Sequence, residues 1–362
     1  MLENKFTVKI MPILIESAVR NGLLFLVSGI HPILPYYEIL SILDLYEIPY
    51  KIKYIYNQVI SLKTNENALD LVRERSTLTH MCGYEIIKPC NNFNIFLDYL
   101  RKIDWKSVID NSFAVRVKKI GYNKINSMEI EGKIGKILHK ISHKKVNLKT
   151  PDTLLIVVIS ENQYILFKLK YDIRREFGKR NLNVRPFVHP STLTPRFAKL
   201  LTNLGMVKNG GNILLDPFVG MGSILIESSL LGIYVIGIDI LWSMCKKCLA
   251  NLKFLDIFYG DIICGDGKNP PLRDNSIKYV ITDPPYGRKA PLYSGNLYNL
   301  LRKFLNNCRI KLKENGRVVI ITPEEVKLDM ISEKYDKIAE FKTRIHRNLT
   351  RRITILKCIK RC

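Results

Sequence analysis

The stretch Asn212-Ile213-Leu214-Leu215-Asp216-Pro217-Phe218-Val219-Gly220-Met221-Gly222-Ser223 has the pattern of a buried strand, a glycine loop and the start of a helix. Glycines in such a loop let the backbone approach a ligand closely, and the N-terminus of the helix favours a negatively charged group. The spacing is not Gly-x-Gly-x-x-Gly, so a dinucleotide is not specifically indicated. Asp216 at the end of the strand suits a cationic group. An ordinary strand–helix turn remains the alternative interpretation of this stretch alone.

The alternation of strands and helices continues through the rest of the chain. Near-continuous apolar strands between helices are typical of a parallel, doubly wound α/β sheet that is buried on both faces. After the helix Ser223–Leu231, the pattern predicts strands at 234–239, 261–264, 278–282, 317–321, 337–343 and 352–356, and helices at 242–254 and 297–312.

Acidic residues follow two successive strands of this series. Asp239 ends the strand after the glycine loop, where an acid commonly binds ribose hydroxyls. Asp266, beside Gly267, follows the next strand and is suitably placed for an adenine amino group. Each acid alone is a weak signal because strands often end in Asp. The ordered series of glycine loop, acid and acid favours a ligand that contains a nucleoside.

The motif Thr282-Asp283-Pro284-Pro285-Tyr286-Gly287 follows the next strand. An exocyclic amine of a base is a poor nucleophile because its lone pair is delocalised into the ring. The Asp283 carboxylate and the Pro284 carbonyl can both accept its hydrogens and so aim that lone pair at a methyl donor. Consecutive prolines stiffen the turn, and Tyr286 offers a face for stacking an extruded base. The alternative is a proline-rich turn that merely ends a strand.

The first half of the chain has a different organisation. A strand at Leu23–Ser28, a helix at Ile33–Tyr46 and a strand at Ile52–Tyr56 are expected in the first 90 residues, and residues 93–170 repeat the mixture. In the second part the predicted strands are 113–117, 154–159 and 164–169, and the predicted helix is 128–142. We therefore expect an N-terminal α/β region at 1–90, a second domain at 91–170, a basic linker at 171–195 and the doubly wound domain at 196–362.

The charge of the chain points to a polyanionic partner. Lys+Arg 57 against Asp+Glu 33 leaves a net charge of +24. Residues 101–180 alone hold 19 lysines and arginines against 8 aspartates and glutamates. Nucleic acid is a better explanation than a membrane surface, and the basic block predicts a docking surface for phosphates. The alternative is a solvated, lysine-rich surface.

Neither metal binding nor membrane insertion is expected. Cys245 and Cys248 form a single Cys-x-x-Cys in a predicted helix without a second pair, and His139 and His143 have no following carboxylate. No apolar stretch reaches the ~18 residues of a membrane helix, and no signal-peptide pattern is present. We expect a cytoplasmic protein.

These motifs resemble those of the class I amino-methyltransferases, and the chain is similar to the archaeal tRNA guanosine-10 N2-methyltransferases over about residues 22–357. Residues 113–117, 131–135 and 146–152 resemble the RNA-binding THUMP domain, and residues 185–195 resemble the segment that leads into that family's catalytic domain and lies against the cofactor. Three residues differ from the family's usual pattern. Ser191 replaces a glycine after His-Pro, Ser223 replaces the third glycine of the glycine loop, and Met221 replaces a threonine whose hydroxyl could bind the cofactor carboxylate.

The resemblance implies S-adenosyl-L-methionine as cofactor, tRNA as partner and a set of site residues. The catalytic residues would be Asp283, Pro284, Pro285 and Tyr286. The cofactor-binding residues would be Leu193, Thr194, Asp216, Phe218, Gly220, Gly222, Ser223, Asp239, Ile240, Asp266, Gly267 and Asp283. The RNA-binding residues would be Arg116, Lys118, Lys119, Lys133, Lys136, Lys149, Arg174 and Arg175.

The sequence leaves several functional alternatives open. The target could be another guanosine of tRNA or rRNA, and one or two methyl groups could be added. A DNA adenine-N6 methyltransferase shares the Asp-Pro-Pro-Tyr motif but would have a target-recognition domain in place of a THUMP domain. A non-catalytic RNA-binding protein is a further alternative. Some relatives in this family use a small activating partner subunit, so one is also an option here.

Overall fold

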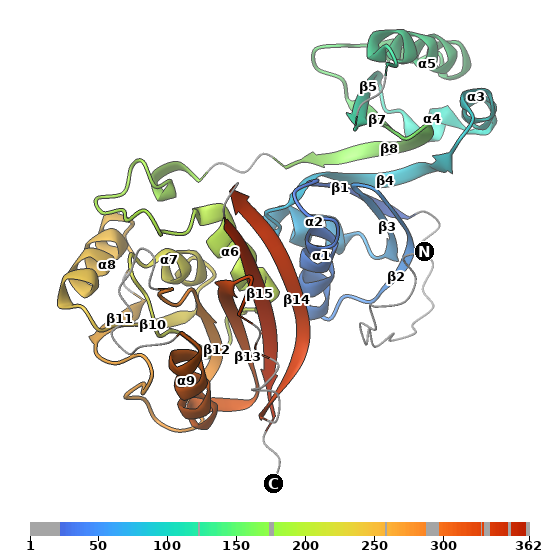
Figure 1. The fold of residues 1–362 in the computed structure, drawn as a ribbon. Coiled ribbons are helices and arrows are strands. Elements are labelled where there is room, and N and C mark those ends of the chain that lie inside the picture. The colour runs from blue at the N-terminus through green and yellow to red at the C-terminus, as the bar shows by residue number, and fades with distance from the viewer. Residues whose placement is uncertain are drawn as a thin grey trace. The chain divides into compact units, whose positions relative to one another are not determined.

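The computed structural model describes residues 22–121, 124–173, 177–257, 259–286, 297–326, 328, 334–346 and 349–359. They form two compact units, 22–173 and 177–359, each of which is described by itself (Figure 1).

The N-terminal unit contains an eight-stranded sheet with the strand order β2-β3-β1-β4-β8-β7-β5-β6. Its elements are β1 Leu23–Val27, α1 Leu34–Leu45, β2 Tyr50–Tyr56, β3 Val59–Thr64, α2 Asn67–Arg75, β4 Thr79–Cys90, α3 Phe93–Lys102, α4 Trp105–Val108, β5 Ser112–Ile120, α5 Ser127–Ser142, β6 Lys145–Val146, β7 Thr153–Ser160 and β8 Gln163–Asp172.

The long strand β4 connects two halves of this sheet. It pairs antiparallel with β1 on one side and with β8 on the other, from Met81 opposite Asp172 to Cys90 opposite Tyr164. One apolar core lies between α1, α2 and strands β1 and β3. A second core lies between α3, α4, α5 and strands β5 and β7. The described residues of the segments 1–90 and 91–170 therefore share one hydrogen-bonded sheet.

The predicted helix at 128–142 is present as α5, and the local sequence explains its limits. The Asn126 side chain accepts hydrogen bonds from the backbone amides of Met128 and Glu129 and so caps the N-terminus. Ile130, Ile134 and Leu138 recur at helical spacing and are buried against the sheet. The helix ends at His143, which has a left-handed conformation with φ +58°.

The C-terminal unit contains a seven-stranded sheet with the strand order β11-β10-β9-β12-β13-β15-β14. Its elements are the 3-10 helix Gly178–Arg180, α6 Pro195–Leu204, β9 Ile213–Asp216, α7 Ser223–Ser229, β10 Tyr234–Asp239, α8 Trp242–Phe254, β11 Gly260–Cys264, β12 Ile277–Thr282, α9 Leu297–Lys311, β13 Leu312–Pro323, β14 Tyr335–His346 and β15 Leu349–Cys358.

The predicted doubly wound α/β class is confirmed, with one correction. Strands β9 to β13 are parallel, and their order reverses between β9 and β12. The sequence pattern predicted parallel strands to the end, but β15 is antiparallel to both β13 and β14. Only two residues separate β14 from β15, and a connection this short permits only an antiparallel pair.

Candidate active site

The switch point between β9 and β12 brings together the ends of the strands that carry the predicted site. Asp216 ends β9 and is 2% exposed. Its Oδ1 accepts hydrogen bonds from Thr282 Oγ1 at 2.7 Å and from the Phe218 amide at 3.2 Å. Burial raises the pKa of Asp216 to about 7, and the nearby Asp283 and Asp239 carboxylates act in the same direction. A cation bound here would compensate the buried charge.

The glycine loop is fixed to the neighbouring strand and leaves open space on one side. The Gly220 amide donates to Asp239 Oδ2 at 3.1 Å. Gly220 has φ +50°, and a Cβ added to it would meet nothing within 4 Å. Gly222 has φ +81°, and a Cβ there would lie 2.6 Å from Cys248 Sγ, so this position excludes larger residues. Phe218 packs edge-on against Phe304, with ring centroids 5.6 Å apart.

The two further acids lie at the carboxyl ends of neighbouring parallel strands: Asp239 ends β10, and Asp266 follows β11 by two residues. Asp239 accepts the Leu241 amide on Oδ1 at 3.0 Å, and burial raises its pKa. Asp266 Oδ1 accepts the Lys268 amide at 3.0 Å, and Lys268 Nζ lies 3.4 Å from Oδ2. Because a carboxylate oxygen has two lone pairs, both acids can accept further hydrogen bonds. Ile240, directly after Asp239, is 49% exposed.

Gly267 lies in the loop after β11 and allows this loop to approach the glycine loop closely. A Cβ at Gly267 would lie 1.9 Å from the Pro217 carbonyl oxygen, which is a backbone atom that cannot move aside easily. Only glycine permits this approach without displacement of the loop.

The structure places three predicted cofactor residues in local structural roles. The Ser223 hydroxyl donates to the Leu193 carbonyl and accepts from Arg185 Nη1, each at 2.8 Å. The Thr194 hydroxyl accepts the Phe197 amide and caps α6. Ser223 and Leu193 are buried. These hydrogen bonds hold the segment before α6 against the helix that follows the glycine loop.

The Asp-Pro-Pro-Tyr loop begins where β12 ends. The Asp283 side chain is 13% exposed, and its Oδ2 lies 3.2 Å from Arg351 Nη1. The Tyr286 hydroxyl donates to Asp283 Oδ1. Burial raises the pKa of Asp283, and the positive charge of Arg351 opposes that shift. Pro284 is buried, whereas Pro285 and Tyr286 are partly exposed beside the site.

Two buried arginines near the site were missed by sequence reasoning. Arg351 of β15 is 8% exposed and pairs with Asp283. Arg185 is 6% exposed, lies in the expected linker and binds Ser223 and the Arg180 carbonyl. Arg180 in turn forms a 2.6 Å ion pair with Glu227, which is 1% exposed. Arg351 is one of two successive arginines in β15, and only the fold shows that Asp283 is its partner.

The predicted RNA-binding residues that are described lie on β5, on α5 and after β6. Lys118, Lys119, Lys136 and Lys149 are exposed. Arg116 is partly buried, donates to the Leu148 carbonyl at 2.7 Å and lies 3.8 Å from Glu131. Lys133 forms a 2.7 Å ion pair with Glu129. Arg174 and Arg175 lie outside the described residues.

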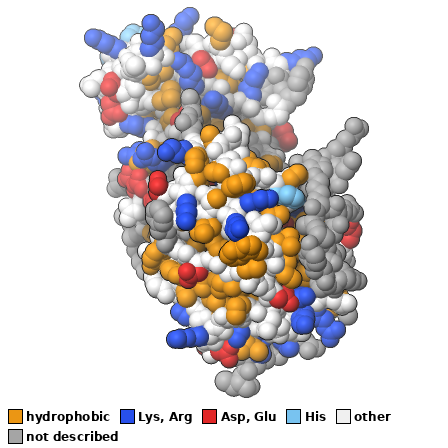
Figure 2. Space-filling model, turned by 90° about the vertical axis from the view of Figure 1, so that its left-hand side faces the viewer, with side chains coloured by type: hydrophobic (Ala, Val, Ile, Leu, Met, Phe, Trp, Pro, Cys, Tyr) orange, Lys and Arg blue, Asp and Glu red, His pale blue; other side chains and the backbone are white. Residues whose placement is uncertain are grey.

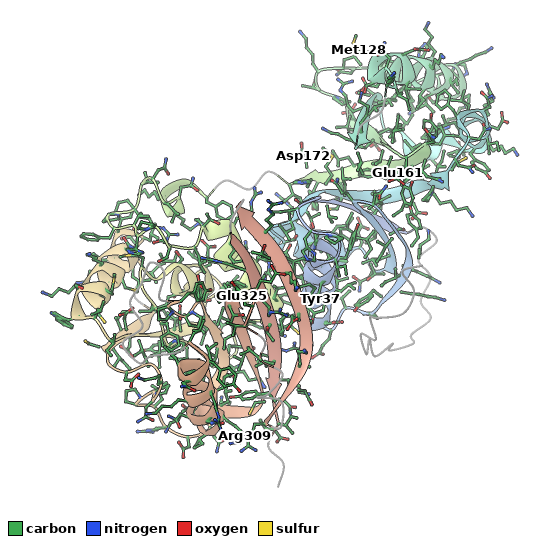
Figure 3. All side chains as sticks on the ribbon, viewed as in Figure 1. Tyr37, Met128, Glu161, Asp172, Arg309 and Glu325 are labelled. Atoms are coloured by element: carbon green, nitrogen blue, oxygen red, sulfur yellow. The ribbon has the colours of Figure 1, made fainter. Side chains whose placement is uncertain are left out.

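Exposed apolar side chains accompany this basic surface. Met128, at the start of α5, is 80% exposed and points away from the unit (Figure 3). Leu148, beside Lys149, is 61% exposed. The surface can therefore offer both charge to phosphates and apolar contact to unstacked bases.

Within the described ranges, no group of three or more His, Cys, Asp or Glu side chains could hold a metal ion. Cys245 and Cys248 are both buried, and Cys248 packs against Gly222. None of the helices described is long and apolar enough to cross a membrane.

Comparison with known families agrees with this geometry. Residues 183–353 match the model of the RMKL-like methyltransferase domain, and residues 90–167 match that of the THUMP domain. The chain is therefore a methyltransferase that carries a THUMP domain.

Two archaeal relatives are similar to the chain over nearly its whole length. The tRNA (guanine(10)-N2)-dimethyltransferase of Methanothermobacter thermautotrophicus is 30% identical over 340 residues, which cover 92% of this chain and 98% of that protein. The protein of the same name from Methanocaldococcus jannaschii is 31% identical and covers 92% of this chain and 99% of its own length. The chain belongs to this family of tRNA (guanine-N2) methyltransferases, which confirms the resemblance seen in the motifs.

The fold also occurs in a solved structure. TrmN from Thermus thermophilus superposes with a TM-score of 0.56 at 21% identity, over 93% of this chain and 100% of that one.

Proposed function

We propose that the protein uses S-adenosyl-L-methionine to methylate the exocyclic N2 of guanosine 10 in tRNA, once or twice. The observation that carries this proposal is the Asp-Pro-Pro-Tyr loop, which lies at the switch point beside Asp216 in a chain similar to two guanine(10)-N2 dimethyltransferases over 92% of its length. Since its substrate would be tRNA, we also propose that it acts in the cytoplasm.

The residues around the glycine loop fit this cofactor. Buried Asp216 would bind its ammonium group, Asp239 its ribose hydroxyls and Asp266 its adenine amino group. Gly220 leaves space for a ligand because an added Cβ would meet nothing within 4 Å. The structural roles of Ser223 and Thr194 leave the glycine-loop backbone and Phe218 as the main further contributors. When bound, the cofactor supplies an electrophilic methyl group on sulfonium sulfur.

The chain's own residues would act mainly by alignment. Asp283 and the Pro284 carbonyl accept the two hydrogens of the guanine amine and orient its lone pair. The Tyr286 hydroxyl and Arg351 each engage one oxygen of Asp283, which fixes the carboxylate. The amine nitrogen would bond to the methyl carbon as the bond between that carbon and the sulfonium sulfur breaks, and it would then release its extra proton to solvent water. A positively charged nitrogen on an aromatic ring is acidic, so no strong base is required.

Asp283→Asn tests this assignment because it keeps the side-chain shape but removes the charged acceptor. We expect methyl transfer in single-turnover assays to fall about 10²–10³-fold, while the Kd for tRNA stays unchanged. Asp266→Asn is the matched control. It should weaken cofactor binding with little effect on the rate at saturating cofactor. If Asp283→Asn lowered tRNA affinity and kept its turnover, the assigned role would be wrong.

The basic surface of β5 and α5 is proposed to bind the tRNA. Support comes from exposed Lys118, Lys119 and Lys136 on neighbouring elements of the region that matches the THUMP domain. Their charges would bind phosphates, which gives affinity without reading the sequence.

We further propose that a small partner protein covers the edge of the catalytic sheet. β11 is the edge strand and pairs only with β10 among the described strands. The large apolar side chains exposed on or near α8 and β11 include Trp242, Leu249, Phe254 and Tyr259. Figure 2 shows apolar side chains gathered on the side of the catalytic unit where α8 lies. A sheet edge without a neighbour among the described strands, with exposed apolar side chains beside it, is typical of a site for a partner.

Substitution of this surface tests for the partner. Trp242→Glu with Phe254→Glu should leave the basal rate of the isolated chain unchanged and abolish stimulation by an added activating subunit. Full activity of the unmodified chain in the absence of any other protein, without further stimulation, would contradict an activating role.

A further inference from the structure

An ion pair joins the antiparallel end of the catalytic sheet to the Asp-Pro-Pro-Tyr loop. Arg351 lies on β15, between Pro323 of β13 and Thr343 of β14 in the sheet register. Its Nη1 is 3.2 Å from Asp283 Oδ2, and the two side chains are only 10% and 13% exposed. Burial of a guanidinium costs free energy unless an opposite charge pairs with it. Removal of either Arg351 or Asp283 would therefore leave the other charge buried without this partner.

The surroundings of Arg351 differ from those of an arginine that only fills space. The guanidinium carbon lies 5.9 Å from the centre of the Tyr286 ring. Arg351 Nε is buried and has no hydrogen-bond partner among the described residues. Its neighbour Arg352 is also buried but donates to the Glu324 carbonyl at 2.6 Å and pairs with Glu340. Of these two arginines, only Arg351 contacts the catalytic loop.

Both oxygens of Asp283 are therefore engaged before any substrate binds. Tyr286 donates to Oδ1, and Arg351 lies against Oδ2. An ionised carboxylate has about four lone-pair sites, so each oxygen keeps one with which to accept a hydrogen from an amine. The two interactions restrict rotation of the carboxylate without using up its capacity as an acceptor.

We propose that Arg351 is a positioning residue for methyl transfer, because its guanidinium holds the Asp283 carboxylate ionised and in one orientation toward the base amine. This inference rests on the proposed role of Asp283 as an acceptor for that amine. The strand β15 would then contribute to the reaction through Arg351, in addition to its pairing with β13 and β14 in the sheet.

The charges that face Asp283 determine the effect of removing Arg351. Arg351 faces it from β15, Tyr286 from its own loop and the Asp216 carboxylate from β9. Burial favours the protonated acid, and Arg351 favours the carboxylate. Without Arg351 the pKa of Asp283 rises, so Asp283 becomes protonated at a higher pH than in the wild type and then no longer acts as a charged acceptor. Raising the pH should then restore part of the rate.

The test is the pH profile of the single-turnover rate of the full chain with saturating tRNA transcript and cofactor. In Arg351→Gln, we expect the acidic limb to move to higher pH by about 1–3 units, with little change in the Kd for tRNA. Arg351→Lys keeps the charge on a shorter reach and should have an intermediate profile. Arg352→Gln removes the neighbouring buried arginine and should leave the limb in place.

The outcomes separate this inference from the proposed function. An equal loss of rate at every pH in Arg351→Gln and Arg352→Gln, without a shift, would mean that Arg351 is only structural. If Arg351→Gln does not fold, an unshifted limb in Arg351→Lys overturns the inference as well. Asp283→Asn at the wild-type rate would instead refute the proposed role of Asp283. A nearly inactive Asp283→Asn with an unshifted Arg351→Gln would refute the role of Arg351 alone.

Discussion

At the scale of single residues, Asp216 has the most informative environment. Its carboxylate is 2% exposed and accepts two hydrogen bonds from Thr282 and Phe218, yet burial still raises its pKa to about 7. The folded protein therefore keeps a proton that the unfolded chain, with an Asp pKa of about 3.9, has already released. Between a pH of about 3.9 and about 7, the contribution of Asp216 to the free energy of unfolding therefore falls as the pH rises. An ammonium group bound beside Asp216 would reverse the effect.

This environment predicts a pH dependence of cofactor binding. The Kd for S-adenosyl-L-methionine should fall as the pH rises toward about 7, by up to about tenfold per unit, because binding requires the ionised form of Asp216. Isothermal titration across this range measures it. Asp216→Asn should weaken binding and remove most of the pH dependence, and Asp239, whose pKa burial also raises, accounts for a smaller remainder. A pH-independent Kd in the wild type would exclude Asp216 as the partner of the ammonium group.

At the scale of elements, the geometry of the site depends on loops that follow parallel strands. The loop after β11 approaches the loop after β9 closely because Gly267 has no side chain to separate it from the Pro217 carbonyl. Each element alone is ordinary, and the site arises where their ends meet.

Two glycines of this loop form a matched pair for an experiment. Gly267→Ala should weaken cofactor binding at least tenfold and lower the midpoint of thermal unfolding, because its Cβ would lie 1.9 Å from the Pro217 oxygen. Gly265→Ala places its Cβ no closer than 3.8 Å to a neighbouring side chain and should be nearly neutral. Cofactor titration and thermal melts of both variants measure the difference. Similar behaviour of the two would contradict the close approach.

Local sequence patterns were sufficient for some elements and not for others. They predicted β9, the glycine loop, β10, α8 and β12, because each has its own periodicity and ends at an identifiable acid or glycine. They did not reveal the ion pair of Arg351 with Asp283. They also did not reveal the hydrogen bond from Arg185 to Ser223 at the start of α7. These interactions depend on which strands become neighbours, and that depends on the whole fold. Ser223 was predicted as a cofactor-binding residue, but no local pattern indicates that its hydroxyl also binds Arg185 and Leu193.

At the scale of the whole molecule, we expect the distribution of charge to determine tRNA binding more than any single interaction does. The net charge of +24 favours association with a polyanion, and the described lysines of β5 and α5 concentrate part of it in the unit that contains the THUMP match. The continuous sheet through β4 and β8 means that substitutions on one half of this unit affect a shared scaffold. Surface lysines are therefore better probes of docking than buried residues.

Replacement of three exposed lysines tests the docking surface. Lys118→Gln, Lys119→Gln and Lys136→Gln combined should weaken tRNA binding and reduce the slope of log K against log salt by about 0.7–0.9 for each phosphate that is no longer neutralised. The control is Lys51→Gln with Lys63→Gln, which removes exposed lysines on β2 and β3 of the same unit. Fluorescence anisotropy over a series of salt concentrations gives both slopes. Equal slopes for the triple variant and the wild type would remove this surface from the tRNA interface.

The most direct test of the central claim is to identify the methylated nucleoside. Unmodified tRNA transcript is incubated with the full chain and labelled S-adenosyl-L-methionine, and the product is digested and separated. We expect label in N2-methylguanosine or N2,N2-dimethylguanosine, and none there when guanosine 10 is replaced. Label on another guanosine would move the target, whereas label on adenine N6, or no label in the presence of bound tRNA and cofactor, would contradict the proposed activity.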